Sequence, residues 1–237
     1  MLNIITALKI EAEPIIKKYD LKARNGIYQN KYINLIITGQ GKIKSAINTA
    51  LLLQKFPQKT LNIGIAGSDE FDINEGFFIH KITDTDSGFE YYPDFFEENS
   101  KEIFTISKLG KYHSLTDMES SGFFEACYKF LSVENIILYK IVSDTPKIKP
   151  DKKLIPDLIE NHLFIIEKLL DEKNDFFKDI EEFLEKANQK MKLTKTQYEE
   201  LKKIIVYYKT KQKPFPKIPI LKNKKEVSEF LNSLTNL

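Results

Sequence analysis

Short apolar runs rich in β-branched residues recur along the first 150 residues. Runs of this kind, without polar alternation, are typical of strands that are buried on both faces of a sheet. They predict strands at Leu2–Ala7, Tyr32–Thr38, Leu61–Ala66 and Asn135–Val142, and a weaker one at Phe77–Ile82.

Segments with helical spacing separate these strands. Apolar residues recur every three or four positions through Glu11–Tyr19, Lys42–Phe56 and Met118–Leu131, which predicts helices with one buried face. Strands that alternate with helices form mainly parallel sheets covered by helices on both faces. The pattern therefore predicts an α/β domain over residues 1–150, with ligands expected at the carboxyl ends of its strands.

Beyond this domain the apolar residues follow helical spacing only. Thr194 and Asn223 each precede a glutamine or glutamate by three residues, which is the spacing of a capping box at a helix start. Three prolines within Lys213–Pro219 exclude a helix and a central strand there. Residues 151–237 are therefore predicted to form an all-helical C-terminal extension.

The composition is that of a folded protein without a membrane span. The 237 residues are 42% hydrophobic and 30% charged, which is ample for a packed core. No apolar run approaches the roughly 20 residues that span a bilayer, and Met1–Lys9 lacks the features of a secretion signal. We expect a cytoplasmic protein that does not contact membranes.

Cysteine and histidine are too scarce to build a metal site. Cys127 is the only cysteine and is expected in the core, while His80, His113 and His162 have no partner at ligand spacing. The histidines are expected to be packed or surface groups rather than catalytic ones. No disulfide, metal or cofactor is therefore expected.

Charge argues against nucleic acid as a partner. The net charge is +2, although acids dominate residues 167–185 and lysines dominate residues 186–225. A basic stretch can mark a nucleic-acid surface or a solvated helix face, and the second interpretation is preferred because no nucleic-acid-binding motif accompanies the lysines. Arg24 is the only arginine among 36 basic residues, so fork-type recognition of phosphate is limited to one side chain.

Three acidic residues occupy positions from which a ligand could be reached. Glu11 follows the first strand in ALKIEAEP, Glu119 opens a helix in DMESSG, and Asp144 ends a strand in KIVSDTP. Such positions border the ligand crevice of an α/β sheet, so the three carboxylates could converge. The alternative is structural: Glu11 and Glu119 would complement helix dipoles, and Asp144 would form a turn before Pro146.

Two loops that contain glycine follow the second and third central strands. They are Thr38–Lys42 (TGQGK) and Gly64–Ser68 (GIAGS). Glycines there let backbone amides approach an anion or a sugar. Neither loop has the spacing of a P-loop or of a dinucleotide-binding fingerprint, which argues against nucleoside triphosphates and dinucleotide cofactors.

Taken in chain order, these motifs resemble the nucleoside phosphorylase/nucleosidase superfamily, in particular its methylthioadenosine/S-adenosylhomocysteine nucleosidases. The resemblance covers residues 1–150, and some segments are more similar to an uncharacterised phosphorylase-like branch. It implies a three-layer αβα sandwich with a twisted mixed, mainly parallel sheet, and a homodimer. It also implies hydrolysis of the N-glycosidic bond of a purine-type nucleoside. The motifs are IITALKIEAEP, TGQGKIKSA, NIGIAGS, DMESSG and KIVSD.

The resemblance implies a role for each matching residue. Glu11 would activate the attacking water, and Asp144, oriented by Ser143, would protonate the leaving base. Glu119 would accept hydrogen bonds from the ribose hydroxyls while Met118 packs against the sugar. The remaining substrate-binding residues would be Gly67, Ser68 and Phe104, the last in a short strand (FTIS) on the purine side.

Two other functions stay open. A phosphorylase would use phosphate in place of water, but the matching loops offer Lys42 and Ser68 and no arginine, so water is the expected nucleophile. A protein that binds a nucleoside or a partner without turnover is the other alternative. It is motivated by the short segment between Asp94 and Glu119 and by the basic helical tail.

Overall fold

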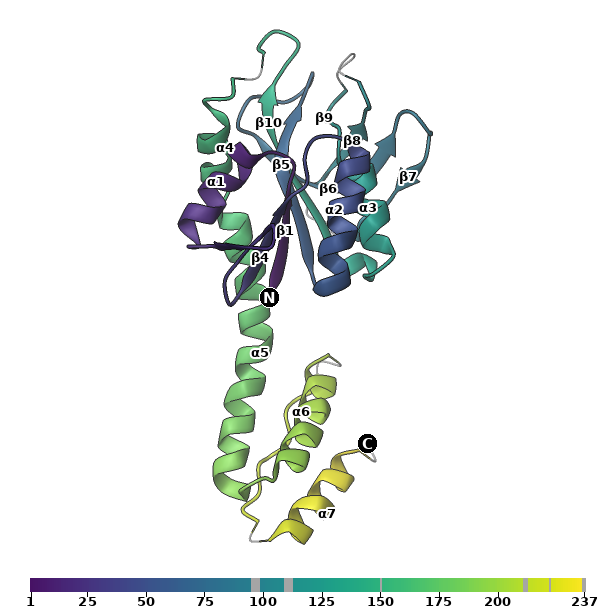
Figure 1. Cartoon of the computed structure of the whole chain (residues 1–237). Helices are drawn as coiled ribbons and strands as arrows, with labels where there is room; N and C mark the ends of the chain where they lie inside the picture. The colour runs from purple at the N-terminus through teal and green to yellow at the C-terminus, as the bar shows by residue number, and fades with distance from the viewer. Residues whose placement is uncertain (95–98, 109–112, 150, 211–212, 222, 236–237) are drawn as a thin grey trace. The chain divides into compact units, whose positions relative to one another are not determined.

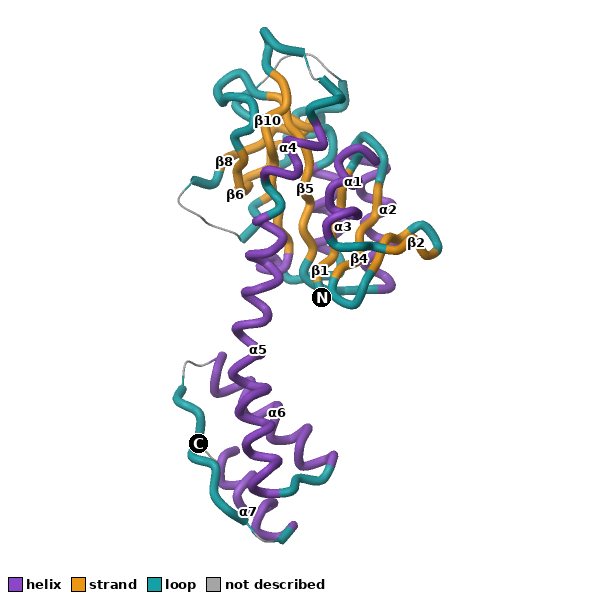
Figure 2. The backbone as a smooth tube through the Cα atoms, turned by 90° about the vertical axis from the view of Figure 1, so that its left-hand side faces the viewer, coloured by secondary structure: helices purple, strands orange, loops and turns teal. Residues whose placement is uncertain are grey.

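A computed structural model describes residues 1–94, 99–108, 113–149, 151–210, 213–221 and 223–235. The chain divides into two compact units, Met1–Leu170 and Asp171–Leu237. All strands of the described residues belong to the first unit, whereas the second consists of helices and loops (Figures 1 and 2). In the described part of the chain, no helix is both long and apolar enough to cross a membrane.

The first unit is a mixed α/β fold built on one sheet. The strands predicted from apolar runs are confirmed as β1, β4, β5, β6 and β10, and shorter strands without a periodic apolar signal join them. The strands are β1 (Leu2–Thr6), β2 (Lys22–Arg24), β3 (Ile27–Gln29), β4 (Ile33–Ile37), β5 (Thr60–Gly67), β6 (Gly76–Asp84), β7 (Glu90–Tyr91), β8 (Lys101–Thr105), β9 (Thr116–Asp117) and β10 (Ile136–Asp144).

The predicted helices of this unit are present with small shifts. The helix expected at Met118–Leu131 runs from Ser120 to Tyr128, and the Asp117 carboxylate accepts the N–H of its first residue, Ser120. The helices are α1 (Lys9–Lys18), α2 (Lys42–Lys55), α3 (Ser120–Tyr128), α4 (Ile155–Asn161) and the start of α5 (Phe164–Met191), with a 3-10 turn at Val133–Asn135.

The sheet combines parallel and antiparallel pairings. Its order is β10-β6-β8-β9-β5-β1-β4-β3-β2, with β7 beside β6. The central strands β4, β1, β5 and β10 are parallel, whereas β10–β6, β5–β9 and the β2–β3–β4 hairpins are antiparallel. Because β10 also pairs with β5, the strands β5, β10, β6, β8 and β9 close into a ring. The sheet is therefore more mixed than the strand and helix alternation predicted.

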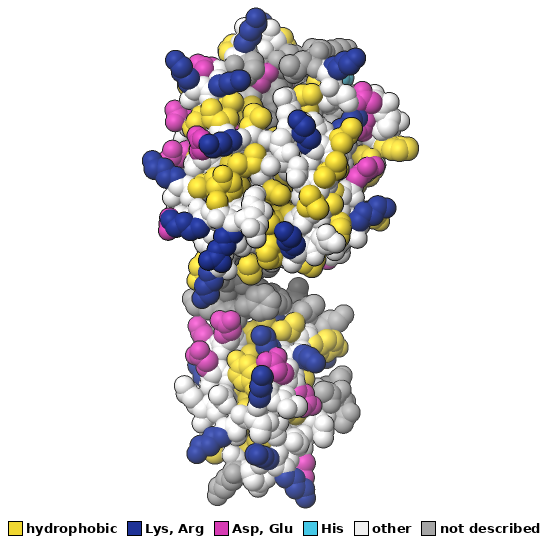
Figure 3. Space-filling view, in the orientation of Figure 1, with side chains coloured by type: hydrophobic (Ala, Val, Ile, Leu, Met, Phe, Trp, Pro, Cys, Tyr) yellow, Lys and Arg dark blue, Asp and Glu magenta, His cyan; other side chains and the backbone are white. Residues whose placement is uncertain are grey.

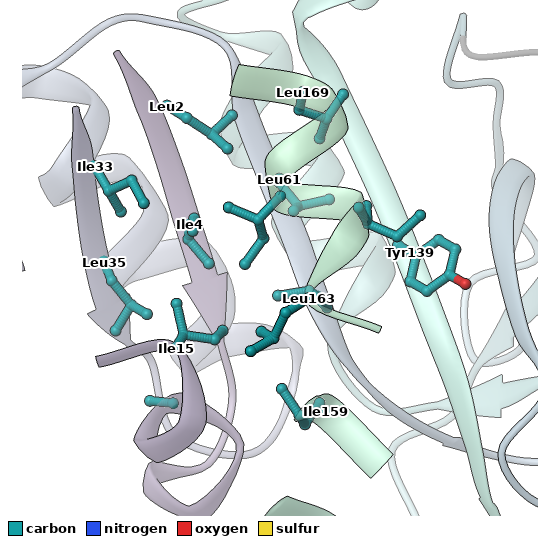
Figure 4. Close-up of a cluster of buried hydrophobic side chains, with 14 of the residues drawn as sticks. Leu2, Ile4, Ile15, Ile33, Leu35, Leu61, Tyr139, Ile159, Leu163 and Leu169 are labelled. Atoms are coloured by element: carbon teal, nitrogen blue, oxygen red, sulfur yellow. The ribbon is translucent and has the colours of Figure 1, made fainter. Parts of the chain in front are cut away.

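Each face of the sheet buries its own apolar cluster. On β1, Ile4 belongs to the cluster with α1 and α4, and Ile5 to the cluster with α2 and α3, because successive side chains of a strand point to opposite faces. Figure 4 shows the first cluster, in which Ile15 of α1 and Ile159 of α4 lie against the strands.

This first cluster moves the end of the α/β unit beyond residue 150. Ile159 of α4, Leu163, and Leu169 of α5 are buried with the strand residues Leu2 and Ile4 (Figure 4). The apolar stripe that was expected to open a separate helical domain covers the sheet instead. The boundary therefore falls after Leu170 rather than at residue 150.

The second unit is helical and has a core of its own. Thr194 and Gln197 form the predicted capping box, since each backbone N–H donates to the other side chain at 3.1 and 3.3 Å. Residues 213–221 form neither helix nor strand, as their prolines predicted, and Phe215 packs edge-on against Phe183. The helices are the remainder of α5, α6 (Lys195–Thr210) and α7 (Lys224–Thr235).

Candidate active site

The carboxyl ends of the central strands border a cavity of about 570 Å³. Its walls come from the β1–α1 turn, the end of β5, the β9–α3 turn and the end of β10. Pockets for small organic ligands measure about 300–1,000 Å³, so the volume suits such a ligand. The residues expected from the sequence that line this one cavity are Glu11, Gly67, Met118, Glu119, Ser143 and Asp144.

Glu11 lies in the first turn of α1, and the main chain holds its carboxylate. Its Oε2 accepts hydrogen bonds from the N–H groups of Ala7 and Leu8 at 2.9 and 2.7 Å. Its Oε1 accepts one from Ile65 at 3.0 Å. The side chain is buried, and this burial raises the pKa of Glu11 above its usual value. A carboxylate can accept about four hydrogen bonds, so Glu11 retains capacity toward the cavity.

Gly64 on β5 provides the space that the Glu11 carboxylate occupies. A Cβ atom at Gly64 would lie 2.9 Å from Oε1 of Glu11, which is closer than such atoms can approach without a shift. The sequence suggested that glycines in this loop approach a ligand. At Gly64 the close neighbour is instead the carboxylate of Glu11.

Glu119, in the β9–α3 turn, forms a hydrogen bond with the glycine turn that precedes α2. Its Oε1 accepts a hydrogen bond from the Gly41 N–H at 2.7 Å, and the Gln40 amide donates to the Met118 sulfur at 3.1 Å. Gly41 has φ of 102°, a conformation that favours glycine. Burial, and then the neighbouring Asp117 charge, raise the pKa of Glu119 to about 7.

Ser143 and Asp144 end β10 at the cavity wall. The Ser143 hydroxyl donates to Oδ1 of Asp144 at 2.6 Å, which orients the carboxyl group. The β10–β5 register shifts between Val142 and Asp144. Just before that shift, Val142 exchanges backbone hydrogen bonds with the turn at Asn74 and Glu75 at 2.9 and 2.8 Å. A second segment of chain therefore holds β10 next to this pair.

Lys140 is a buried cation behind the carboxylates that the sequence analysis did not identify. Its Nζ lies 2.9 Å from Oδ2 of Asp117, and both side chains are almost fully buried. Burial by itself would lower the pKa of Lys140, but the charges of Asp117, Glu119 and Glu11 raise it. A lysine within the otherwise apolar run IILYKIV was the available signal, because buried lysines are almost always paired.

Ser68 does not line the cavity, in contrast to the expectation from the sequence. Its side chain is fully buried. The hydroxyl accepts the N–H groups of Glu70 and Phe71 at 3.0 and 2.8 Å and donates to the carbonyl of Ser114. Ser68 therefore fixes the turn after β5, because these local hydrogen bonds take up its hydroxyl.

Phe104 also lies outside the cavity lining. Its ring stacks on His113 with centroids 4.4 Å apart, so at least one face of the ring is covered by a neighbouring loop. Ile106, which follows β8, lines the cavity instead. The strand expected around FTIS exists as β8, and a contact of Phe104 with a purine stays a prediction.

The Lys42 side chain is paired with two aspartates and is not free to bind an anion. Its Nζ lies 2.9 and 2.8 Å from the two oxygens of Asp84 and 2.6 Å from Oδ2 of Asp86. The Ser121 hydroxyl donates to Asp84 at 2.7 Å, which links this ion pair to α3. Arg24 is exposed on β2 and is not among the residues that line the cavity.

Comparison with known proteins identifies related folds. No family model matches the sequence. A segment of 74 residues is 32% identical to 5'-methylthioadenosine/S-adenosylhomocysteine nucleosidase of Bacillus pumilus, and covers 28% of this chain and 32% of that protein. The match thus spans about a third of this curated relative's length.

Solved structures match over a larger part of the chain. The apo 5'-methylthioadenosine nucleosidase of Arabidopsis thaliana has a TM-score of 0.62 at 14% identity, covering 71% of this chain and 95% of that one. A futalosine hydrolase mutant of Helicobacter pylori has a TM-score of 0.58 at 16% identity, covering 72% and 98%. The expected resemblance to methylthioadenosine/S-adenosylhomocysteine nucleosidases is confirmed, and at these identities the structural matches show a shared fold.

Proposed function

We propose that the protein is a nucleosidase that hydrolyses the N-glycosidic bond of a purine-type nucleoside. One observation carries this proposal: Glu11, Glu119 and Asp144, which are distant in sequence, line a single cavity of about 570 Å³. The local sequence match and the shared fold support it. In this proposal the three-layer αβα unit contains the active site, and the C-terminal helical extension is an appendage to it.

The chemistry assigns a task to each group. Cleavage of the bond between C1′ and the base nitrogen builds positive charge on the ribose and negative charge on the base. Asp144, oriented by Ser143, donates a proton to the departing base. Glu119 accepts hydrogen bonds from the ribose hydroxyls. Glu11 takes a proton from the water whose oxygen bonds to C1′, and its raised pKa suits a general base better than that of an ordinary carboxylate.

The state of the cations favours water over phosphate as the nucleophile. A phosphorylase needs cationic groups that are free to bind phosphate. Three contacts of 2.6–2.9 Å bind Lys42 to Asp84 and Asp86, Lys140 is paired with Asp117, and Arg24 is exposed on β2. Lys9 and Lys152 also line the cavity, but both are exposed to solvent, where an ion pair contributes little. We therefore prefer hydrolysis to phosphorolysis.

The proposed activity is tested by base release from a panel of purine nucleosides. We expect release without phosphate, and a loss of about 100-fold or more in kcat for Asp144→Asn, because general-acid catalysis contributes about 10²–10⁴-fold. Phosphate-dependent formation of ribose 1-phosphate would instead select the phosphorylase. Tight nucleoside binding without any release, unchanged in Asp144→Asn, would select the non-catalytic alternative.

We also propose that the enzyme is a homodimer that associates through α2. Ile43, Ile47 and Leu51 are each more than half exposed and share one helix face at spacings of four residues. In Figure 3, hydrophobic side chains gather on the surface over α2. A groove of about 860 Å³ beside them is lined by Phe124 and Tyr128 of α3. A two-fold contact would bury the ridge of each copy in the groove of the other. Sedimentation as a monomer at micromolar concentration would contradict this.

A further inference from the structure

Asp84 is a buried carboxylate that binds two helices next to the cavity without lining it. It ends β6 and is 4% exposed. The Nζ of Lys42, the first residue of α2, donates to its two oxygens at 2.9 and 2.8 Å. The hydroxyl of Ser121, the second residue of α3, donates to its Oδ2 at 2.7 Å. None of these three residues belongs to the cavity lining, so Asp84 connects α2 and α3 from outside the cavity.

The two helix starts that Asp84 connects are also the ones that hold Glu119. Gly41, immediately before Lys42, donates its N–H to Oε1 of Glu119 at 2.7 Å. Glu119 in turn lies two residues before Ser121 and lines the cavity. The same two turns are therefore joined twice, by the Gly41–Glu119 bond at the cavity and by Asp84 behind it.

The backbones of α2 and α3 touch at this place. Gly122, the third residue of α3, has no room for a Cβ atom, because the carbonyl group of Lys42 occupies that space. The two helices also pack side by side (Figure 1). Hydrogen bonds weaken steeply once their distance or angle departs from a narrow range. A small shift of the first turn of α2 against that of α3 would therefore break the Gly41–Glu119 bond.

The Asp84 carboxylate is itself fixed and charged. The N–H groups of Asp86 and Ser87 each donate to its Oδ1 at 3.0 Å. Burial by itself raises the pKa of this carboxyl, but the hydrogen bonds from Lys42, Ser121 and Ser87 lower it to about 2. At neutral pH Asp84 is therefore ionised and able to hold the lysine and the serine together.

We propose that Asp84 is a positioning residue that holds Glu119 in place to bind the ribose hydroxyls. This inference rests on the proposed nucleosidase function and adds a residue that acts on its sugar site. Asp84 touches no substrate. It fixes the first turn of α2 against that of α3, and so fixes the Gly41 N–H that orients the Glu119 carboxylate. Substitution of Asp84 should therefore weaken recognition of the ribose hydroxyls in particular.

Hydrogen exchange of the Gly41 amide, followed by NMR, tests this positioning without a substrate. In the full-length wild type we expect slow exchange, because the amide is bonded to a buried carboxylate. Asp84→Asn and Ser121→Ala should each accelerate it about tenfold or more. Glu102→Gln is the matched control and should leave it unchanged. Glu102 also pairs with a lysine of β6, Lys81, at 3.0 Å, but it lies on β8 rather than on a helix.

The effect on the sugar site is measured with nucleoside pairs that differ by one hydroxyl. The pairs are adenosine with 2′-deoxyadenosine, and inosine with 2′-deoxyinosine. For Asp84→Asn we expect kcat/KM for the ribonucleoside to fall about 10- to 100-fold, since a displacement of about 1 Å can cost this much. The ratio of ribonucleoside to deoxynucleoside should fall toward that of Glu119→Gln. Adding Asp84→Asn to Glu119→Gln should lower this ratio no further.

The outcomes separate this inference from the proposed function. Unchanged Gly41 exchange in Asp84→Asn and Ser121→Ala overturns the inference, and so does an equal loss of kcat/KM for both members of each nucleoside pair. If Asp84→Asn does not fold, Ser121→Ala decides, because it removes only the contact with α3. If the wild type releases no base from either pair, the nucleosidase proposal loses its support, and Gly41 exchange still decides whether Asp84 positions Glu119.

Discussion

Glu11 shows how one side chain can serve both the fold and the chemistry. Its carboxylate caps the start of α1 through Ala7 and Leu8 and reaches across to Ile65 on β5. The N–H groups at a helix start lack partners within the helix. Because such groups bind the Glu11 carboxylate, the helix start itself fixes the position of this side chain. Glu11 can therefore stabilise the start of α1 and also face a ligand in the cavity, which are the two interpretations that the sequence left open.

Gly64→Ala should damage catalysis through Glu11. The added methyl group would lie 2.9 Å from Oε1, so the carboxylate must turn or β5 must shift. We expect kcat to fall about 10- to 100-fold, since a displacement of about 1 Å can cost this much. Stability should fall by about 1–3 kcal/mol, as in other overpacked sites. Steady-state kinetics and thermal unfolding measure the two effects.

A double-mutant cycle with Glu11→Gln is the control for this substitution. If Gly64 acts only through Glu11, adding Gly64→Ala to Glu11→Gln should lower kcat no further. Additive losses of kcat would contradict this interpretation and would indicate a general disturbance of β5.

At the scale of elements, α4 is connected through a turn to the end of β10 that borders the cavity. His162, at the end of α4, lies 2.8 Å from the Tyr139 hydroxyl and 3.0 Å from the carbonyl oxygen of Asn74. Asn74 donates its N–H to Val142 at 2.9 Å, immediately before Ser143. His162 is thus a packed residue, as its apolar helix face predicted, and it also holds the turn that supports β10.

His162→Phe should loosen this connection. The loss of two hydrogen bonds is expected to cost about 1–3 kcal/mol of stability. Because Val142 precedes the Ser143–Asp144 pair, kcat should fall more than the affinity for substrate. His80→Phe on β6 is the control, and we expect it to leave kcat unchanged. Unchanged kcat in His162→Phe, at a temperature where the variant remains folded, would rule out a positioning role.

At the scale of the whole molecule, the boundary between the two units determines which shortened chain should remain folded. Seven buried apolar residues between Ile155 and Leu169 complete the core of the sheet. Burial of each such side chain contributes about 1.5–3 kcal/mol, so their sum of roughly 10 kcal/mol or more matches the total stability of a typical domain. These residues therefore belong to the α/β unit.

A chain that ends at Leu170 should consequently remain folded and active, whereas one that ends at Lys149 should aggregate. Soluble yield, a cooperative thermal transition and base release distinguish the two. A soluble, cooperatively folded chain of residues 1–149 would show that α4 and the start of α5 are dispensable for the sheet.

The sequence predicted those features that arise from local pattern. Long apolar strands, amphipathic helices and the acidic residues at strand ends were all visible in it, and Glu11, Glu119 and Asp144 line one cavity as expected. The pairing of Lys140 with Asp117 was not visible, because it depends on how two distant segments meet. Ser68 and Phe104 do not line the cavity, which the sequence did not indicate because the residues they contact, Ser114 and His113, come from another loop.

Closure of β5, β10, β6, β8 and β9 into a ring has a consequence for self-association. Unpaired strand edges are templates for intermolecular β-pairing and fibril growth. Along the described order of the sheet, the path ends at β2. This strand is only three residues long, and its side chains, which include Lys22 and Arg24, are all exposed. A short, charged terminal strand of this kind is a poor template, so the β2 end of the described sheet is protected against growth by strand addition.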